Sequence, residues 1–260
     1  MLLINFLKFN QMKVKIQTVI LAMLIGLTSA STFASAITEI EAANKAGKAV
    51  FLVVTDIGIS ETENAMKIAN QAHKLYAKSV VVKMNRSETV NKEIVEKYRL
   101  ISAPLPLILV IASNGIATGG FLYNQATAEK IVSLIPTPKK AEVLEAISNG
   151  KSVFLVVSKK SMKENKEVMS KCEIACTEMN NNAKVISIDI DDKNETAFIN
   201  ELKIDKSITQ PQTYVINAQG QLTGTLNGVI DSKILVATAK KRIAGGCCSP
   251  GSGKSCGPTK

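Results

Sequence analysis

The sequence of 260 residues predicts an α/β protein that contains one unit twice in tandem, each copy a mixed sheet flanked by helices. Residues 47–55 (GKAVFLVVT) return as residues 150–158 (GKSVFLVVS), and seven of these nine positions are identical. A proline followed nine residues later by a glycine also occurs in both copies, beginning at Pro106 and at Pro211. Because the two matches have nearly the same offset, 103 and 105 residues, they indicate an internal duplication.

Each repeat is predicted to begin with an amphipathic helix and a central strand. The helices are expected at 37–45 and 141–147, and the strands at 50–54 and 153–157. These strands are continuous runs of β-branched and aromatic residues, a pattern typical of burial on both faces. In the helix that follows in the first repeat, apolar residues three and four apart share one face. The members of that face are Ala65, Ile68, Ala69, Ala72 and Leu75.

The second half of each repeat is predicted to add a strand, a helix, a hairpin and a terminal helix. Residues 185–190 largely alternate apolar and polar side chains, which is typical of a strand with one solvent-facing side. In the first repeat, Asn114-Gly115 between apolar runs is a strong hairpin signal. The other elements are expected at 80–84, 91–98, 107–111 and 128–135 in the first repeat, and at 195–202, 213–216 and 232–241 in the second.

The composition excludes several classes of protein. With 46% hydrophobic residues the chain is too apolar to be disordered, and 15 Gly plus 7 Pro are too few for a fibrous protein. A single histidine excludes a zinc site with several histidine ligands. Five cysteines are too few for a fold held mainly by disulfides, and their odd number leaves at least one thiol unpaired within a monomer.

Residues 1–36 predict a secretory signal peptide. Three lysines and no acidic residue accompany a short apolar stretch, 19–27, and an Ala-x-Ala end at Ala34 to Ala36. The apolar stretch is too short to span a bilayer, so no stable membrane insertion is expected after cleavage. The expected location is therefore the periplasm or the extracellular space. Translation could start at Met1 or at Met12, and removal of the segment lowers the net charge from +10 to +7.

The order of elements, the buried first strand and the proline before the third strand resemble the thioredoxin fold in both repeats, over residues 37–243. The resemblance implies a cis proline that faces the active site, and this role falls on Pro106, with Pro104 as the alternative, and on Pro211. Trans prolines that simply begin a strand are the other interpretation. Both prolines are expected to lie in loops that face a bound peptide.

The cysteine pair that the resemblance implies is missing. Catalytic thioredoxin-like proteins have a Cys-x-x-Cys pair at the start of the first helix after the central strand, where the helix N-terminus lowers the thiol pKa. This chain has Gly-Ile-Ser-Glu at 58–61 and Ser-Met-Lys-Glu at 161–164. The sequence therefore argues against an enzyme and resembles the non-catalytic thioredoxin-like domains. Ser60 with Glu63, and Ser161 with Glu164, have the spacing of helix capping boxes.

All five cysteines lie in the second repeat and its tail. Cys172 falls on an apolar helix face, which predicts a small buried residue, and Cys176 is expected nearer the surface. Four residues apart on a helix, their Cβ atoms lie about 5–6 Å apart. A disulfide needs about 3.8 Å. One soft metal ion between two thiolates would fit, with Cu or Zn as candidate cofactors. Cys247, Cys248 and Cys256 lie in a tail rich in Gly and Ser that is expected to be flexible.

Three functions follow as hypotheses for an organisation of signal peptide (1–36), two thioredoxin-like domains (37–137 and 138–244) and tail (245–260). The first is an extracytoplasmic binding protein whose cysteines hold a soft metal or exchange disulfides, at a site of Cys172, Cys176, Cys247, Cys248 and Cys256. The second is a non-catalytic scaffold that binds a protein or peptide and has structural disulfides. The third is an oxidoreductase with displaced thiols. No nucleic-acid partner is expected, because aromatic content is low, 4%.

Overall fold

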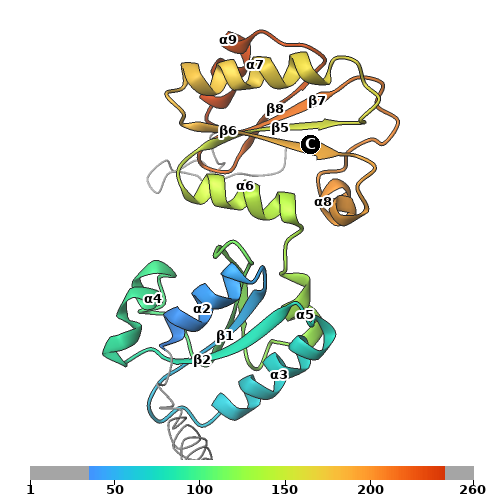
Figure 1. Cartoon of the computed structure of the whole chain (residues 1–260). Helices are drawn as coiled ribbons and strands as arrows, with labels where there is room; N and C mark the ends of the chain where they lie inside the picture. The colour runs from blue at the N-terminus through green and yellow to red at the C-terminus, as the bar shows by residue number, and fades with distance from the viewer. Residues whose placement is uncertain (1–34, 244–260) are drawn as a thin grey trace, which may run out of the picture. The chain divides into compact units, whose positions relative to one another are not determined.

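Each repeat forms one four-stranded mixed sheet with helices on both faces in the computed structural model, which describes residues 35–243 (Figure 1). The first repeat contains α2 (Ala36–Lys45), β1 (Ala49–Thr55), α3 (Thr62–Leu75), β2 (Ser79–Asn85), the 3-10 helix η1 (Thr89–Asn91), α4 (Lys92–Lys97), β3 (Leu107–Ile111), β4 (Ala117–Leu122) and α5 (Ala128–Ser133). The second contains α6 (Pro138–Ser148), β5 (Ser152–Ser158), α7 (Asn165–Glu178), β6 (Ala183–Asp189), η2 (Lys193–Glu195), α8 (Thr196–Glu201), β7 (Gln212–Ile216), β8 (Leu222–Asn227) and α9 (Ser232–Ala239).

The two sheets have the same topology, which confirms the predicted mixed sheets. The strand orders are β2-β1-β3-β4 and β6-β5-β7-β8. In each sheet the first two strands of the repeat are parallel, and the third and fourth form an antiparallel hairpin. The third strand also pairs antiparallel with the first, so that Val153 lies opposite Ile216 in the second sheet. The central strand is therefore covered by a neighbour on each edge.

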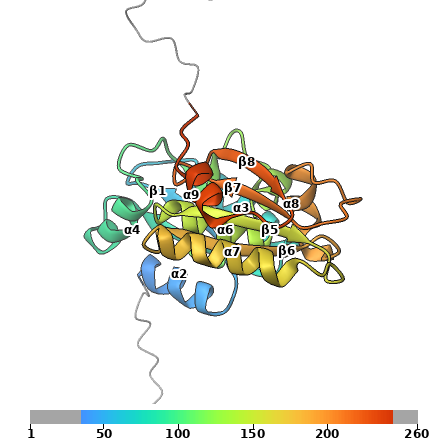
Figure 2. The ribbon, with the colours of Figure 1, turned by 90° about the horizontal axis from the view of Figure 1, so that it is seen from above.

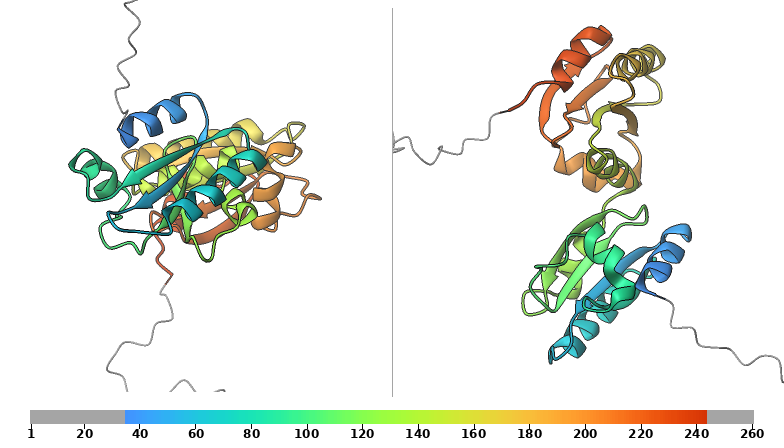
Figure 3. Two further views of the ribbon diagram at one scale, coloured as in Figure 1. Left: turned by 90° about the horizontal axis from the view of Figure 1, so that it is seen from below. Right: turned by 90° about the vertical axis from the view of Figure 1, so that its left-hand side faces the viewer.

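The core of each repeat lies on both faces of this central strand. Every residue of β1 is buried, as its sequence predicts. Val50 and its alternate neighbours pack with α2 and α4, whereas Phe51 and Val53 pack with α3 and α5 on the other face (Figure 3). In the second repeat α7 and α9 lie together on the face that Phe154 buries (Figure 2). The period of two in a strand produces this two-sided core.

The N-termini of α3 and α7 do not form the predicted capping boxes. α3 begins at Thr62 and α7 at Asn165, and neither has a side-chain cap at its N-cap residue. Ser60 therefore precedes the helix, and the capping-box interpretation is wrong for both repeats. Instead, the Thr62 hydroxyl donates to the carbonyl of Ile59 at 3.0 Å and so holds the loop before α3. A side chain that bonds its own loop competes with the capping geometry.

α6 begins three residues before its predicted start. Pro138 occupies the first helical turn, where its fixed φ suits the helix and its missing N–H costs nothing. The Thr137 side chain caps this end by accepting a hydrogen bond from the N–H of Lys140 at 3.4 Å. None of the helices within residues 35–243 is long and apolar enough to cross a bilayer.

The two predicted proline positions differ in isomer. The Leu105–Pro106 bond is cis, which confirms the expectation from the resemblance, and it is the one cis bond among residues 35–243. The same expectation is wrong at Pro211, whose preceding bond is trans, the isomer that X–Pro bonds favour by about 0.5–1 kcal/mol. Both hairpins turn through a glycine with positive φ, Gly115 and Gly220, as the turn signals predict.

Candidate functional site

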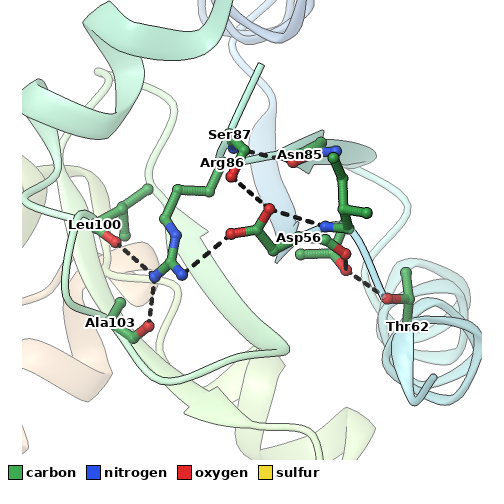
Figure 4. Close-up of polar contacts among 9 residues, drawn as sticks. Asp56, Thr62, Asn85, Arg86, Ser87, Leu100 and Ala103 are labelled. Carbon is green, nitrogen blue, oxygen red and sulfur yellow. Dashed lines mark hydrogen bonds and ion pairs between the residues drawn. The ribbon is translucent and has the colours of Figure 1, made fainter. Parts of the chain in front are cut away.

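The end of each repeat that carries the proline loop, here called the proline end, is where the resemblance places a site. In the first repeat it consists of residues 56–61 after β1 and 101–106 before β3. A polar network joins these loops: Arg86 donates through Nη1 to the carbonyl of Ala103 at 2.8 Å and to that of Leu100 at 3.4 Å (Figure 4). Its Nη2 lies 3.2 Å from Oδ2 of Asp56. Arg86 thus links the loop after β1 to the proline loop.

Asp56 is the acceptor at the centre of this network. Its carboxylate accepts hydrogen bonds from the Ser87 hydroxyl and from the N–H of Ile57, the latter at 2.8 Å (Figure 4). These two bonds, and Arg86 beside them, hold the pKa of Asp56 below its ordinary value of 3.8, although burial acts in the opposite direction. Asp56 is therefore ionised at neutral pH, and its carboxylate holds Ser87 and Arg86 at this end of the sheet.

The proline end of the second repeat lacks this network. Ile190 occupies the position in the second repeat that Arg86 occupies in the first. In each repeat the N–H of this residue donates to the carbonyl of the last residue of that repeat's central strand. Ile190 is only 2% exposed and packs into the core. In this repeat Asn165 holds the loop after β5, donating through Nδ2 to the carbonyl of Lys159 at 2.8 Å. No arginine ties this loop to the proline loop.

A pocket of about 440 Å³ lies at this proline end, between the loop after β5 and the loop before β7. Its lining combines apolar and hydrogen-bonding side chains and contains no cysteine. The lining residues are Lys159, Ser161, Met162, Lys163, Glu164, Ile208, Thr209, Gln210 and Pro211. Gln210 is exposed, and within the described range its backbone N–H and C=O have no hydrogen-bond partner. The pocket therefore offers apolar contact and an unpaired backbone group side by side.

Cys172 lies in the core of the second repeat, as predicted for a small buried residue. Its side chain is 0% exposed, among the residues that α7, α9 and the sheet bury. Burial raises the pKa of its thiol to about 12, although a hydrogen bond with the Thr213 side chain acts in the opposite direction. Because thiolate is the reactive and metal-binding form, Cys172 is poorly suited to either task at neutral pH.

Cys176 is half-buried and thus lies nearer the surface than Cys172, as predicted. Burial raises the pKa of its thiol, the charge of Glu173 raises it further, and Lys151 lowers it. Within residues 35–243 both thiols are free, which agrees with the expectation that the helix keeps them from bonding to each other. Among residues 35–243, no group of three or more His, Cys, Asp or Glu side chains could hold a metal ion.

The other candidate cysteines are outside the structure, whereas the one histidine of the chain is inside it. Cys247, Cys248 and Cys256 lie outside the described residues, as does the predicted signal peptide. His73, which aligns with Cys176, is half-buried, and its Nδ1 lies 3.0 Å from the Ser79 hydroxyl. That hydroxyl donates its one proton to the carbonyl of Tyr76 at 2.6 Å. In the bond between His73 and Ser79, the hydroxyl oxygen is therefore the acceptor and the N–H at Nδ1 is the donor. His73 thus links the end of α3 to the start of β2.

Sequence reasoning missed Asp56 and Arg86, and it missed that Ile190 replaces the arginine. The available signal was the alignment of the two repeats. A charged residue directly after the second strand of the first repeat aligns with an isoleucine in the second repeat. The alternation of the strand 185–190 predicted that Ile190 is buried, but not that its counterpart clamps a loop.

No protein-family model matches this sequence, and no curated protein matches it either. Several solved structures are similar to it in fold. The NTD_N/C domain of alkylhydroperoxide reductase AhpF from Enterococcus faecalis is 13% identical, with 78% of this chain and 98% of that chain covered and a TM-score of 0.29. The first two thioredoxin domains of Saccharomyces cerevisiae Eps1p are 10% identical, with 80% and 97% covered and a TM-score of 0.31.

The zinc-bound form of human ERp44 is also similar, at 10% identity and a TM-score of 0.33, with 77% of this chain and 55% of that chain covered. At such scores and identities these similarities carry no argument about activity or ligands. The assignment of the fold depends on the topology of the two sheets, the buried central strands and the helices on both faces. These features show two thioredoxin-like folds in tandem, without a Cys-x-x-Cys pair at either proline end.

Proposed function

We propose that this chain is a non-catalytic, extracytoplasmic binding protein that holds an extended peptide segment of another protein at the proline end of the second repeat. The observation that carries the proposal is the pocket between the loop after β5 and the loop that ends at Pro211. Peptide segments bind by adding backbone hydrogen bonds to exposed strand-like backbone, while neighbouring pockets take alternate side chains. Gln210 lies in a bend two residues before β7 begins, and its unpaired backbone beside the pocket supports this proposal.

The thiols support a binding role more than a catalytic one. The pocket contains no cysteine, and the Cys172 thiol, with a pKa of about 12, is protonated at neutral pH. Cys172 is also 0% exposed, so its thiol is out of contact with solvent. Soft-metal binding and thiol exchange depend on the three cysteines outside the described residues, and both stay predictions. The extracytoplasmic location follows from the predicted signal peptide.

The proposal is tested by measuring the binding of overlapping peptides that cover the sequence of α-lactalbumin, with their cysteines reduced and carboxymethylated. We expect a subset of apolar peptides to bind the chain. Met162→Glu places a charge in the pocket and is expected to weaken binding about tenfold or more, which corresponds to about 1.4 kcal/mol. Ile59→Glu, at the matching position of the first repeat, is the control and is expected to leave binding unchanged. Absence of binding, or equal binding by Met162→Glu, would refute the proposal.

A further inference from the structure

The loop after the central strand has opposite charge in the two repeats. Residues 56–63 of the first repeat (DIGISETE) contain three acidic residues and no basic residue, a net charge of −3. The equivalent residues 159–166 of the second repeat (KKSMKENK) contain four lysines and one glutamate, a net charge of +3. The proline loops, 101–106 and 205–211, have no net charge in either repeat. The two proline ends therefore differ in charge because of the loop after the central strand.

Two of these four lysines line the pocket, and their charge is not taken up by an ion pair. Lys159 and Lys163 both belong to the lining, the first half-buried and the second exposed. Neither forms an ion pair within residues 35–243, whereas Lys160 pairs with Asp189 at 3.4 Å. An unpaired ammonium group beside a pocket attracts an anionic ligand, and the low-dielectric walls strengthen the attraction.

Two acidic residues lie near these lysines without cancelling their charge. Glu164 is the one acidic residue of the lining. A Cβ atom at Gly228 would lie 3.5 Å from its Oε2, so this carboxylate lies on the side of the pocket next to Gly228. Asp205 is not part of the lining, and hydrogen bonds from Ser207, with a smaller effect of the Lys159 charge, lower its pKa. The lining thus combines two cations with one anion.

We propose that this pocket selects acidic segments, with an apolar side chain of the bound peptide in the pocket and flanking Asp or Glu carboxylates against the ammonium groups of Lys159 and Lys163. The inference rests on the proposed function and names the class of segment that the site takes. Apolar contact is available from Met162, Ile208 and Pro211. The lining contains no aromatic side chain on which a base could stack, which favours a peptide over a nucleic acid.

The inference is tested with charged versions of one peptide. The α-lactalbumin peptide that binds most tightly, made with Ser in place of any Cys, is extended at each end by three Asp or by three Lys. Fluorescence anisotropy gives the Kd of each version at about 20 mM and about 500 mM NaCl, since salt screens exposed charges. We expect the Asp version to bind about tenfold or more tightly than the Lys version at low salt, and this ratio to fall strongly at high salt.

Three variants assign the preference to the pocket. Lys159→Gln combined with Lys163→Gln is expected to lower the preference for the Asp version to about threefold or less, with the binding of the unextended peptide changed by less than about twofold. Glu164→Gln removes the opposing charge and is expected to strengthen binding of the Asp version. Lys240→Gln combined with Lys241→Gln is the matched control, because both lysines are exposed and lie at the opposite end of the sheet, beside the residue that follows β7.

The outcomes separate this inference from the proposed function. If no α-lactalbumin peptide binds, both fail together. If peptides bind, but the Asp and Lys versions bind equally or the preference persists in Lys159→Gln with Lys163→Gln, this inference alone is overturned. Displacement of the Asp version by oligothymidylate at a lower concentration than by unlabelled peptide would also overturn it, since it would indicate a nucleic-acid site. Thermal denaturation of each variant excludes unfolding as the cause of a changed Kd.

Discussion

Replacing Arg86 by isoleucine, the residue of the second repeat at this position, is expected to destabilise the first repeat without unfolding it. The Arg86 side chain is 23% exposed, and its shortest hydrogen bond goes to the carbonyl of Ala103 at 2.8 Å. Leaving a buried carbonyl without a donor costs about 1–3 kcal/mol. Because Ala103 is half-buried, water replaces part of the lost donor, and we expect a cost in the lower half of this range, about 1–2 kcal/mol.

The other contacts of Arg86 add little to this cost. The carbonyl of Leu100 is 3.4 Å from Nη1 and keeps a second donor, the N–H of Ala103 at 3.2 Å. The ion pair with Asp56 is partly open to water, since the two side chains are 23% and 20% exposed, and water screens part of its attraction. The predicted effect is therefore that of one lost hydrogen bond to the proline loop.

Native-state hydrogen exchange measured by mass spectrometry separates the two repeats. A loss of about 1–2 kcal/mol raises the exchange rate of the most protected amides of β1 and β3 about 5- to 30-fold, since about 1.4 kcal/mol is a factor of ten. The amides of β5 and β7 are expected to be unchanged. Lys92→Ile, which removes an exposed ion pair with Glu96, is the matched control and should change little. A change below twofold in Arg86→Ile would show that the arginine does not hold the proline loop.

Two further outcomes follow from the structure. Gly120→Ala would place a Cβ atom 2.7 Å from the carbonyl oxygen of Ile108. We therefore expect the free energy of unfolding to fall by about 1–3 kcal/mol, with a clearly lower melting temperature. An unchanged melting temperature would contradict the packing of β4 on β3. Asp56 has a depressed pKa in the folded state, so its ionised form stabilises the first repeat above about its ordinary value of 3.8, and this contribution is lost as the pH falls through the folded-state value. Asp56→Asn should therefore be less stable than the wild type in urea at neutral pH, and this difference should narrow as the pH is lowered below about 3.8. A difference that does not change with pH would argue against the network.

Local patterns predicted most of the fold because the physics they depend on is local. The run from Val50 to Val54 forms a fully buried strand, and Asn114-Gly115 forms a hairpin turn, as expected. The burial of Cys172 and the greater exposure of Cys176 also followed from their positions on one helix. Periodicity and turn chemistry act over a few residues, and both repeats carry them in the same order.

The candidate site could not be predicted in the same way, since it combines residues that are distant in sequence. Arg86 reaches carbonyls 14 and 17 residues away and a carboxylate 30 residues away. The capping boxes failed for a related reason: Thr62 bonds the carbonyl of Ile59 in its own loop, and the helix begins after the predicted residue. Side-chain competition of this kind depends on the folded backbone.

The sequence by itself determined the duplication, the α/β class and the absence of a Cys-x-x-Cys pair, because these depend on residue identity and on local periodicity. The tertiary structure decided how the two copies differ. It placed Arg86 as a clamp in the first repeat, and it placed the buried Ile190 at the same position of the second, where a pocket lies beside Pro211. It also placed Lys159 and Lys163 in the lining of this pocket. Such differences arise only when strands and loops far apart in the chain meet, because that meeting decides which groups are paired and which are free.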